Sequence, residues 1–170
     1  MDIYGIWPFG SELLMAEWLA ACAQSTDPVF LAVTDHTSGD RVGMVSYLNI
    51  VPDAWRLELG NIWYGPTVQR TCANTESIYL MLCESFDQLG YRRVEWKCDA
   101  LNAKSRAAAT RLGFSFEGIF RQHLIYKGRN RDTAWFSMLD AEWQEIKQNI
   151  ERWLYENEDG HVSLTQLNAS

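Results

Sequence analysis

The chain has 170 residues, which fits one domain with one hydrophobic core. Apolar residues make up 47% and charged residues 22%, and the net charge of -7 disfavours a general nucleic-acid-binding protein. No apolar run is long enough to cross a bilayer, no secretory signal pattern opens the sequence, and the cysteines lack metal-binding spacing. We therefore expect a cytoplasmic protein with free thiols, no metal, and neither a membrane nor a nucleic-acid partner.

The first part of the sequence predicts one helix followed by three antiparallel strands. Ser11 is a typical N-cap for a helix over residues 11–23, in which apolar residues recur at helical spacing. Gly60, within the third strand, indicates a β-bulge or a close backbone approach. The strands are expected over residues 30–34, 42–50 and 55–63.

The middle of the sequence predicts a helix, a strand and a second helix. Gly90 follows the first helix as its left-handed C-terminal residue. The apolar stripe of that helix comprises Ile78, Leu82, Phe86 and Leu89. Residues 93–98 alternate strictly between polar and apolar, which predicts a strand. Asn102 is a typical N-cap for the next helix, which ends at Leu112 and Gly113.

The last part predicts a β-hairpin and a final helix. Strands over residues 114–126 and 132–139 flank the sequence KGRNR, which we expect to be the hairpin loop. The final helix carries an apolar stripe of Trp143, Ile146, Ile150, Trp153 and Leu154. Residues 1–156 then form one mixed α+β domain, and the polar tail over residues 157–170 is expected to fray.

Positive charge is concentrated in residues 91–131. This segment holds ten of the fifteen Lys and Arg residues and only three acidic residues. The pattern fits either a solvated basic face or a basic rim that binds a small polyanion, such as a phosphorylated cofactor.

The element order and three segments together resemble the GNAT superfamily of acyl-CoA-dependent N-acetyltransferases, and most closely its RimJ/RimL-type branch. The segments are LELGNIWYGPTVQRTCANTE, DALNAKSRAAATRLGFSFEGIFR and KGRNRDTAWFSMLDAEW. The resemblance implies a mixed, mostly antiparallel, splayed sheet flanked by helices. The family normally begins with a strand and a helix before the helix at residues 11–23. We therefore expect a shortened N-terminus that lacks these two elements.

The resemblance also implies acetyl-CoA as co-substrate, held by two elements. A helix N-terminus suits its pyrophosphate, because the first backbone N–H groups there are unpaired. The first element is the third strand with the loop after it, where the matching residues are Asn61, Ile62, Trp63, Gln69, Arg70, Thr71, Cys72, Ala73, Asn74 and Thr75. In the second element, Asn102 and Ser105 would contact the pantetheine arm beside the narrow side formed by Ala103, Ala107 and Ala108. Cys72 and Asn74 occupy positions where the family pattern has glycine and glycine or alanine.

Acetyl transfer requires that the amine lose a proton and that the leaving thiolate gain one. Many relatives carry a tyrosine acid where this chain has Ala109, and the resemblance gives the acid role to Ser105 instead. Glu58 matches the family's Glu-x-Gly and is the candidate base, with a solvated strand carboxylate as the alternative. Asp99 and Tyr126 are weaker candidates for the base, and His123 is expected to be structural.

The resemblance implies transfer of an acetyl group to a primary amine of a small molecule, for example in a biosynthetic pathway, or to a peptide N-terminus. Two alternatives stay open: a catalytically impaired acyl-CoA-binding protein, and a degenerate interaction domain that binds no cofactor. An exposed sheet edge at the shortened N-terminus predicts a homodimer or a weakly folded monomer.

Overall fold

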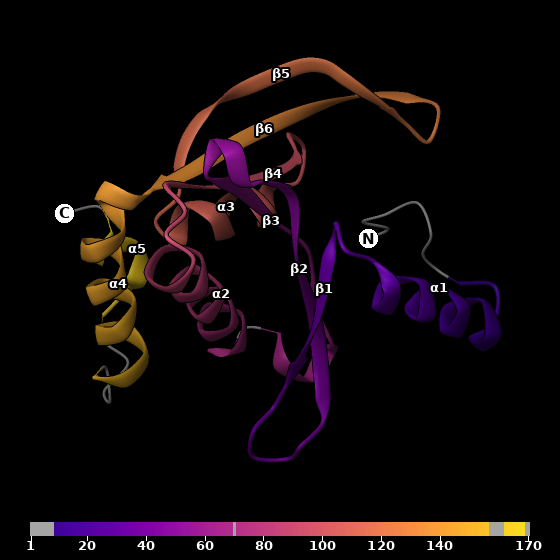
Figure 1. Ribbon diagram of the computed structural model, residues 1–170, viewed down its shortest axis with the longest axis horizontal. Coiled ribbons are helices and arrows are strands. Elements are labelled where there is room, and N and C mark those ends of the chain that lie inside the picture. Colours follow the sequence, from indigo (N-terminus) through magenta and orange to yellow (C-terminus); the bar gives the residue numbers. More distant parts are fainter. Residues whose placement is uncertain (1–8, 70, 157–161, 169–170) are drawn as a thin grey trace.

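The computed structural model describes residues 9–69, 71–156 and 162–168, which form one six-stranded sheet with helices on both sides (Figure 1). The strands are β1 (Val29–Thr34), β2 (Arg41–Val51), β3 (Arg56–Tyr64), β4 (Arg93–Asp99), β5 (Ser115–Tyr126) and β6 (Arg129–Leu139). The helices are α1 (Glu12–Gln24), α2 (Ala73–Cys83), α3 (Ala103–Arg111), α4 (Asp140–Tyr155) and the short α5 (Leu164–Leu167). This order confirms the predicted α+β class.

The strand order is β1-β2-β3-β4-β6-β5, and only β3 and β4 pair in parallel. Figure 1 shows α2, α4 and α5 on one side of the sheet and α1 on the other. The core lies between the sheet and the first group of helices, and it includes Leu57, Leu59, Val94, Ile78, Leu82, Phe136, Trp143 and Ile150. None of the described helices is both long and apolar enough to cross a membrane.

Two predicted N-caps are present. Ser11 Oγ accepts a hydrogen bond from the Leu14 amide at 3.2 Å, and Asn102 Oδ1 accepts one from the Ser105 amide at 3.1 Å. The predicted stripe of α2 fails at its end, because the helix continues as a π-helical turn over Glu84–Gln88. That turn shifts the helical phase, so Leu89 is 48% exposed rather than buried.

The loop of the last hairpin is shorter than predicted. Strand β6 begins at Arg129, so the turn consists of Lys127 and Gly128 alone. Their φ angles of 51° and 73° are those of a type I′ turn, whose twist matches that of the flanking strands.

Part of the C-terminal tail packs on the domain, contrary to the expectation that it frays. Leu164 is 2% exposed and joins the core, and Asn168 Nδ2 donates to the Arg111 carbonyl at 3.0 Å. The tail residues 157–161 and 169–170 lie outside the described residues.

Gly43 allows β2 to lie close to the end of β3. A Cβ atom at Gly43 would lie 2.6 Å from the Trp63 carbonyl oxygen, whereas a Cβ at Gly65 would have its nearest atom, the Val42 oxygen, at 3.5 Å. We predict that Gly43→Ala lowers the free energy of unfolding by about 2 kcal/mol, as expected for an overpacked site. Gly65→Ala is the matched control, and equal urea midpoints for the two variants would contradict the prediction.

Asp87 links the π-helical turn to α4. Its carboxylate accepts hydrogen bonds from Trp143 Nε1 at 2.8 Å and Lys147 Nζ at 2.9 Å. Burial acts to raise the pKa of Asp87, but the bonds from Lys147 and Trp143 lower it overall.

A carboxylate whose pKa is lowered by folding stabilises the protein above the unfolded-state pKa and loses this effect as pH falls. We predict that Asp87→Asn, which keeps an acceptor for Trp143, lowers the free energy of unfolding at pH 7 by about 1 kcal/mol. The difference from wild type should shrink below about pH 4. Urea unfolding at several pH values tests this, with the exposed Asp53→Asn as control; a constant difference would refute it.

Candidate active site

The parallel pairing of β3 and β4 stops halfway along both strands. Residues 56–59 pair with residues 93–96, and no further pair joins the two strands. Beyond that point β3 stays paired with β2 as far as Tyr64, and β4 stays paired with β6 as far as Asp99. The two strands therefore diverge after Leu59 and Trp96, which is the splay that the family resemblance implied.

A β-bulge lies on β3 directly after the divergence. Asn61 and Ile62 together oppose one residue of β2, and Asn61 has a φ of 51°. Its side-chain Nδ2 donates to Ser46 Oγ at 2.9 Å, and that hydroxyl donates to the Gly60 carbonyl at 3.0 Å. Ser46 is fully buried, so these bonds fix the bulge. A bulge leaves backbone polar groups outside the ladder, where a ligand can use them.

The loop after β3 leads into the N-terminus of α2. Gln69 Nε2 donates to the Tyr64 carbonyl at 3.1 Å, and Thr71 Oγ1 donates to the Val68 carbonyl at 2.7 Å. Cys72 is exposed at the N-cap, and its side chain makes no capping bond. The Ala73 amide donates to Thr71 Oγ1 at 3.3 Å, so the unpaired first-turn N–H groups of α2 are those of Asn74 and Thr75. Together with the partial positive charge of the helix start, they suit an anion. Arg70 lies outside the described residues.

Arg111, at the end of α3, reaches this helix start. Its guanidinium donates to Thr75 Oγ1 at 2.8 Å and to Asn74 Oδ1 at 3.0 Å, and it lies 5.9 Å from the Trp153 ring. Burial lowers the pKa of Arg111, but the group stays charged near neutral pH. The side chains of Asn74 and Thr75 both bind Arg111. The groups at the helix start that are left for a ligand are therefore the backbone amides of these two residues.

Ser105 lies on the first turn of α3, close to the end of the paired part of β4. Its Oγ accepts a hydrogen bond from Trp96 Nε1 at 3.0 Å, which fixes the position of the hydroxyl. Burial raises the pKa of the neighbouring Cys98 thiol, and a hydrogen bond with Ser105 opposes this rise. The structure therefore brings together the two predicted residues Asn102 and Ser105.

Glu58 lies on the opposite face of the sheet and is 6% exposed, so it is not the solvated carboxylate considered as the alternative. Its Oε2 accepts from Asn49 Nδ2 and from Lys97 Nζ, both at 2.7 Å. Lys97 also lies 4.0 Å from the centre of the Trp135 ring and 3.6 Å from Glu95 Oε2. These contacts leave Oε1 as the freer oxygen of Glu58.

A charge-balanced network surrounds this pair. Arg56 lies 3.5 Å from Glu95 Oε2, and Arg93 binds Glu95 and both oxygens of Glu117. Hydrogen bonding to Arg93 lowers the pKa of Glu117. Three carboxylates and three cations make up the network: Glu58, Glu95, Glu117, Arg56, Arg93 and Lys97.

The weaker candidates for the base have other partners. Burial acts to raise the pKa of Asp99, but the Leu101 amide and Arg129 lower it overall, which makes this carboxylate a poor base. His123 Nδ1 lies 3.0 Å from Thr133 Oγ1, as befits a structural histidine. Tyr126 lies beside the hairpin turn, next to Lys127.

The narrow side of α3 is exposed. Ala103 and Ala107 line an open hollow of about 370 Å³ with Arg106, Thr110, Phe116 and Phe136. Ala109 is fully buried on the other side of the helix. Ala108 is not part of this hollow, so the predicted alanine side is divided between two surroundings.

Sequence reasoning missed three residues of the site: Lys97, Trp96 and Arg111. The alternation of residues 93–98 placed Lys97 and Trp96 on opposite faces, but it did not show that Lys97 lies beside Glu58, because that contact depends on the pairing of β3 with β4. The reach of Arg111 to Thr75 spans 36 residues of sequence and has no local signal.

Residues 7–115 match the family model described as the Acetyltransferase (GNAT) domain. A curated relative from Bacillus subtilis, named "Putative ribosomal N-acetyltransferase YdaF", is 29% identical over 109 residues. The alignment covers 64% of this chain and 59% of the relative, so this chain spans less than two thirds of that protein's length. The relative's name agrees with the RimJ/RimL-type branch.

Two solved structures are similar over most of the chain. A GCN5-related N-acetyltransferase from Brucella melitensis is 44% identical with a TM-score of 0.90, covering 95% of this chain and 75% of the other. A probable GNAT-family acetyltransferase from Chromobacterium violaceum is 41% identical with a TM-score of 0.78, covering 84% of this chain and 71% of the other. The family match spans more than half of the sequence and agrees with the splay, the bulge and the two helix starts. The chain belongs to the GNAT acetyltransferase family.

Proposed function

We propose that this chain is an acetyl-CoA-dependent N-acetyltransferase acting on a primary amine of a small molecule or a peptide N-terminus. The observation that carries the proposal is the divergence of β3 and β4, with the Asn61 bulge on one strand and Ser105 just beyond the other. Membership of the family supports acyl transfer as the chemistry.

The residues present fit acetyl-CoA, which when bound supplies an activated acetyl thioester. Its pyrophosphate requires donors and positive charge, and the first-turn amides of α2 with the Arg111 guanidinium provide both. Cys72 stands at a family glycine position, but its exposed side chain makes no capping bond with these amides. Asn102, as the N-cap of α3, would hold the pantetheine arm.

The transfer forms a nitrogen–carbon bond and breaks the carbon–sulfur bond. A backbone N–H freed at the Asn61 bulge would polarise the carbonyl oxygen during attack. The Ser105 hydroxyl, positioned by the Trp96 indole N–H, would donate its proton to the departing sulfur.

The amine must also lose a proton. Glu58 Oε1 would accept it, directly or through a water molecule, because Oε2 already binds Asn49 and Lys97. The network around Glu58 carries three positive and three negative groups, so it gives no excess negative potential. This balance favours an acceptor with a single amine over a polyamine.

The alternative is an acyl-CoA-binding protein with impaired catalysis. Ala109, where many relatives have a tyrosine acid, and the ion pair between Glu58 and Lys97 favour it. Calorimetric titration of the full chain with acetyl-CoA, followed by a mass-spectrometric screen of amines and peptides, separates the two. Binding with turnover supports the enzyme, binding without turnover supports the alternative, and a folded chain that does not bind refutes both.

Ser105→Ala should lower kcat about tenfold or more while the KM for acetyl-CoA changes little, because a general acid acts in the transition state. Ser105→Thr keeps a hydroxyl and should restore most of the rate. Ser115→Ala, at an exposed position, is the control. If the alanine and threonine variants have the same kcat, Ser105 is not the acid.

Replacement of Arg111 should weaken cofactor binding rather than slow the chemistry. We predict that Arg111→Met raises the Kd for acetyl-CoA about tenfold, because a charged hydrogen-bond donor is removed from an anion site. The Kd of Arg111→Lys should fall between those of wild type and Arg111→Met. The Kd of Arg121→Met, a change at an exposed position, should equal that of wild type. Calorimetry on variants with a native circular dichroism spectrum tests this, and an unchanged Kd for Arg111→Met would contradict it.

A further inference from the structure

Lys97 fills a compact binding site for an ammonium group on the face of the sheet opposite the core. Its Nζ lies 2.7 Å from Glu58 Oε2, 3.6 Å from Glu95 Oε2 and 4.0 Å from the centre of the Trp135 ring. The strand register brings these groups together, because Glu58 pairs with Glu95 and Lys97 pairs with Trp135. Carboxylates and the face of an indole ring both attract ammonium ions. The same groups would therefore attract the ammonium group of a ligand.

The lysine leaves part of this site unused. The Glu95 side chain is only 7% exposed, and its Oε2 is buried without a hydrogen-bond partner among the described residues. Lys97 at 3.6 Å and Arg56 at 3.5 Å form ion pairs with this oxygen, but both are too distant for a good hydrogen bond. Buried polar atoms are normally paired. An ammonium group that is not tied to β4 could bind the Oε2 atoms of both Glu58 and Glu95.

The charge of the surrounding network depends on Lys97. Without it, the network holds two cations and three carboxylates, which is one negative charge in excess. The two remaining cations, Arg56 and Arg93, both lie against Glu95. Among the described residues, Glu58 would then have no cation beside it. Loss of the lysine would thus leave an anionic site of the size of one ammonium group next to the proposed base.

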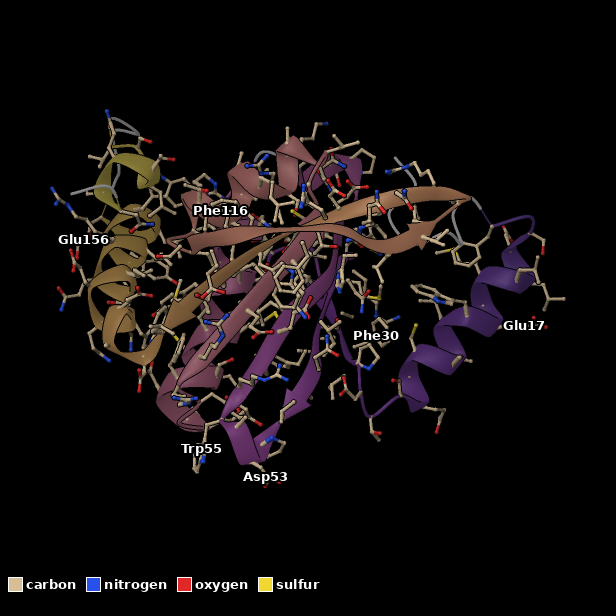
Figure 2. All side chains as sticks on the ribbon, turned by 90° about the horizontal axis from the view of Figure 1, so that it is seen from above. Glu17, Phe30, Asp53, Trp55, Phe116 and Glu156 are labelled. Carbon is tan, nitrogen blue, oxygen red and sulfur yellow. The ribbon has the colours of Figure 1, made fainter. Side chains whose placement is uncertain are left out.

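Helix α1 does not cover this site, although it lies on the same side of the sheet. It stands by the β1 edge, where the Trp18 ring packs edge-on against Phe30 at 6.2 Å (Figure 2). Strands β2 and β3 separate that edge from β4. The Lys97 side chain keeps 16% of its surface exposed, so a small ligand can reach its surroundings.

We propose that Lys97 determines which amines this chain accepts, because its own ammonium group fills the place where the second ammonium group of a diamine would bind. The wild-type chain then takes monoamines, and loss of Lys97 opens the acceptor face to diamines. The inference rests on the proposed function, which places the acceptor on this face. The ammonium site itself is defined by contacts alone, so it can be tested by binding without turnover.

The first experiment offers the vacated site an ammonium ion. Lys97→Ala should bind ethylammonium at least tenfold more tightly than wild type in calorimetry, and ethylammonium chloride should raise its Tm above that in equal sodium chloride. Lys97→Met should not respond, because its side chain fills the space without a charge. Lys147→Ala is the matched control, since Lys147 pairs with Asp87 at 2.9 Å, away from this site.

A buried carboxylate left unpaired destabilises a fold, so the stability of Lys97→Ala needs its own measurement. If this variant does not fold in sodium chloride, refolding in ethylammonium chloride makes the same test. Recovery of the native circular dichroism spectrum supports the proposal, and its absence overturns it. Equal ethylammonium affinities of Lys97→Ala and wild type would also overturn it.

The second experiment measures specificity. The ratio of kcat/KM for a straight-chain diamine to that for the monoamine of equal length should rise about tenfold in Lys97→Ala, because the excess negative charge attracts the second ammonium group. An unchanged ratio would contradict the proposal. Acetylation of Lys97 itself by acetyl-CoA, detected by peptide mass, would also contradict it, because the lysine would then be a nucleophile rather than a fixed cation. A wild-type chain that acetylates no amine refutes the proposed function, whereas the ethylammonium titration reads the ammonium site in either case.

Discussion

The parallel pairing of β3 with β4, and its early end, is the constraint on which the rest of the structure depends. Parallel neighbours require a crossover, and here the crossover is α2, which must start close to where β3 ends. Because the pairing ends early, β3 and β4 diverge and the sheet opens. The crossover places the N-terminus of α2 near this opening. Strand β4 then leads into α3, so the second helix start reaches the same end of the sheet. One pairing rule thus collects the bulge, the α2 amides and Ser105 around a single opening.

Strand β4 connects the two faces of the sheet through adjacent residues. Trp96 faces the helices and holds Ser105, whereas Lys97 faces the other way and holds Glu58. The proposed proton donor and proton acceptor are therefore fixed from opposite sides of one strand. This arrangement suits a transfer in which cofactor and amine approach from different faces. It also explains why Glu58 is buried: the face opposite the core carries its own compact layer of ion pairs rather than solvated side chains.

Local signals predicted the elements well, whereas contacts distant in sequence were not predictable. Ser11 and Asn102 cap helices as expected, because capping depends on only a few residues. The exposure of Leu89 was missed, since a π-helical turn adds a residue to the turn without a clear sequence signature. The environment of Glu58 depends on Asn49 and Lys97, which come from two other strands. Strand alternation alone could assign faces, but it could not reveal which polar groups meet there.

Helix α1 and the proposed acceptor face lie on the same side of the sheet. Helix α1 lies opposite α2 and α4, and the hairpin that extends above it includes β6, whose Trp135 lies against Lys97. The Trp135 ring therefore excludes water from one side of Lys97, the partner of Glu58. A drier surrounding strengthens the ion pair between these two groups. The β5–β6 hairpin therefore borders the site whose charge state the proposed chemistry depends on.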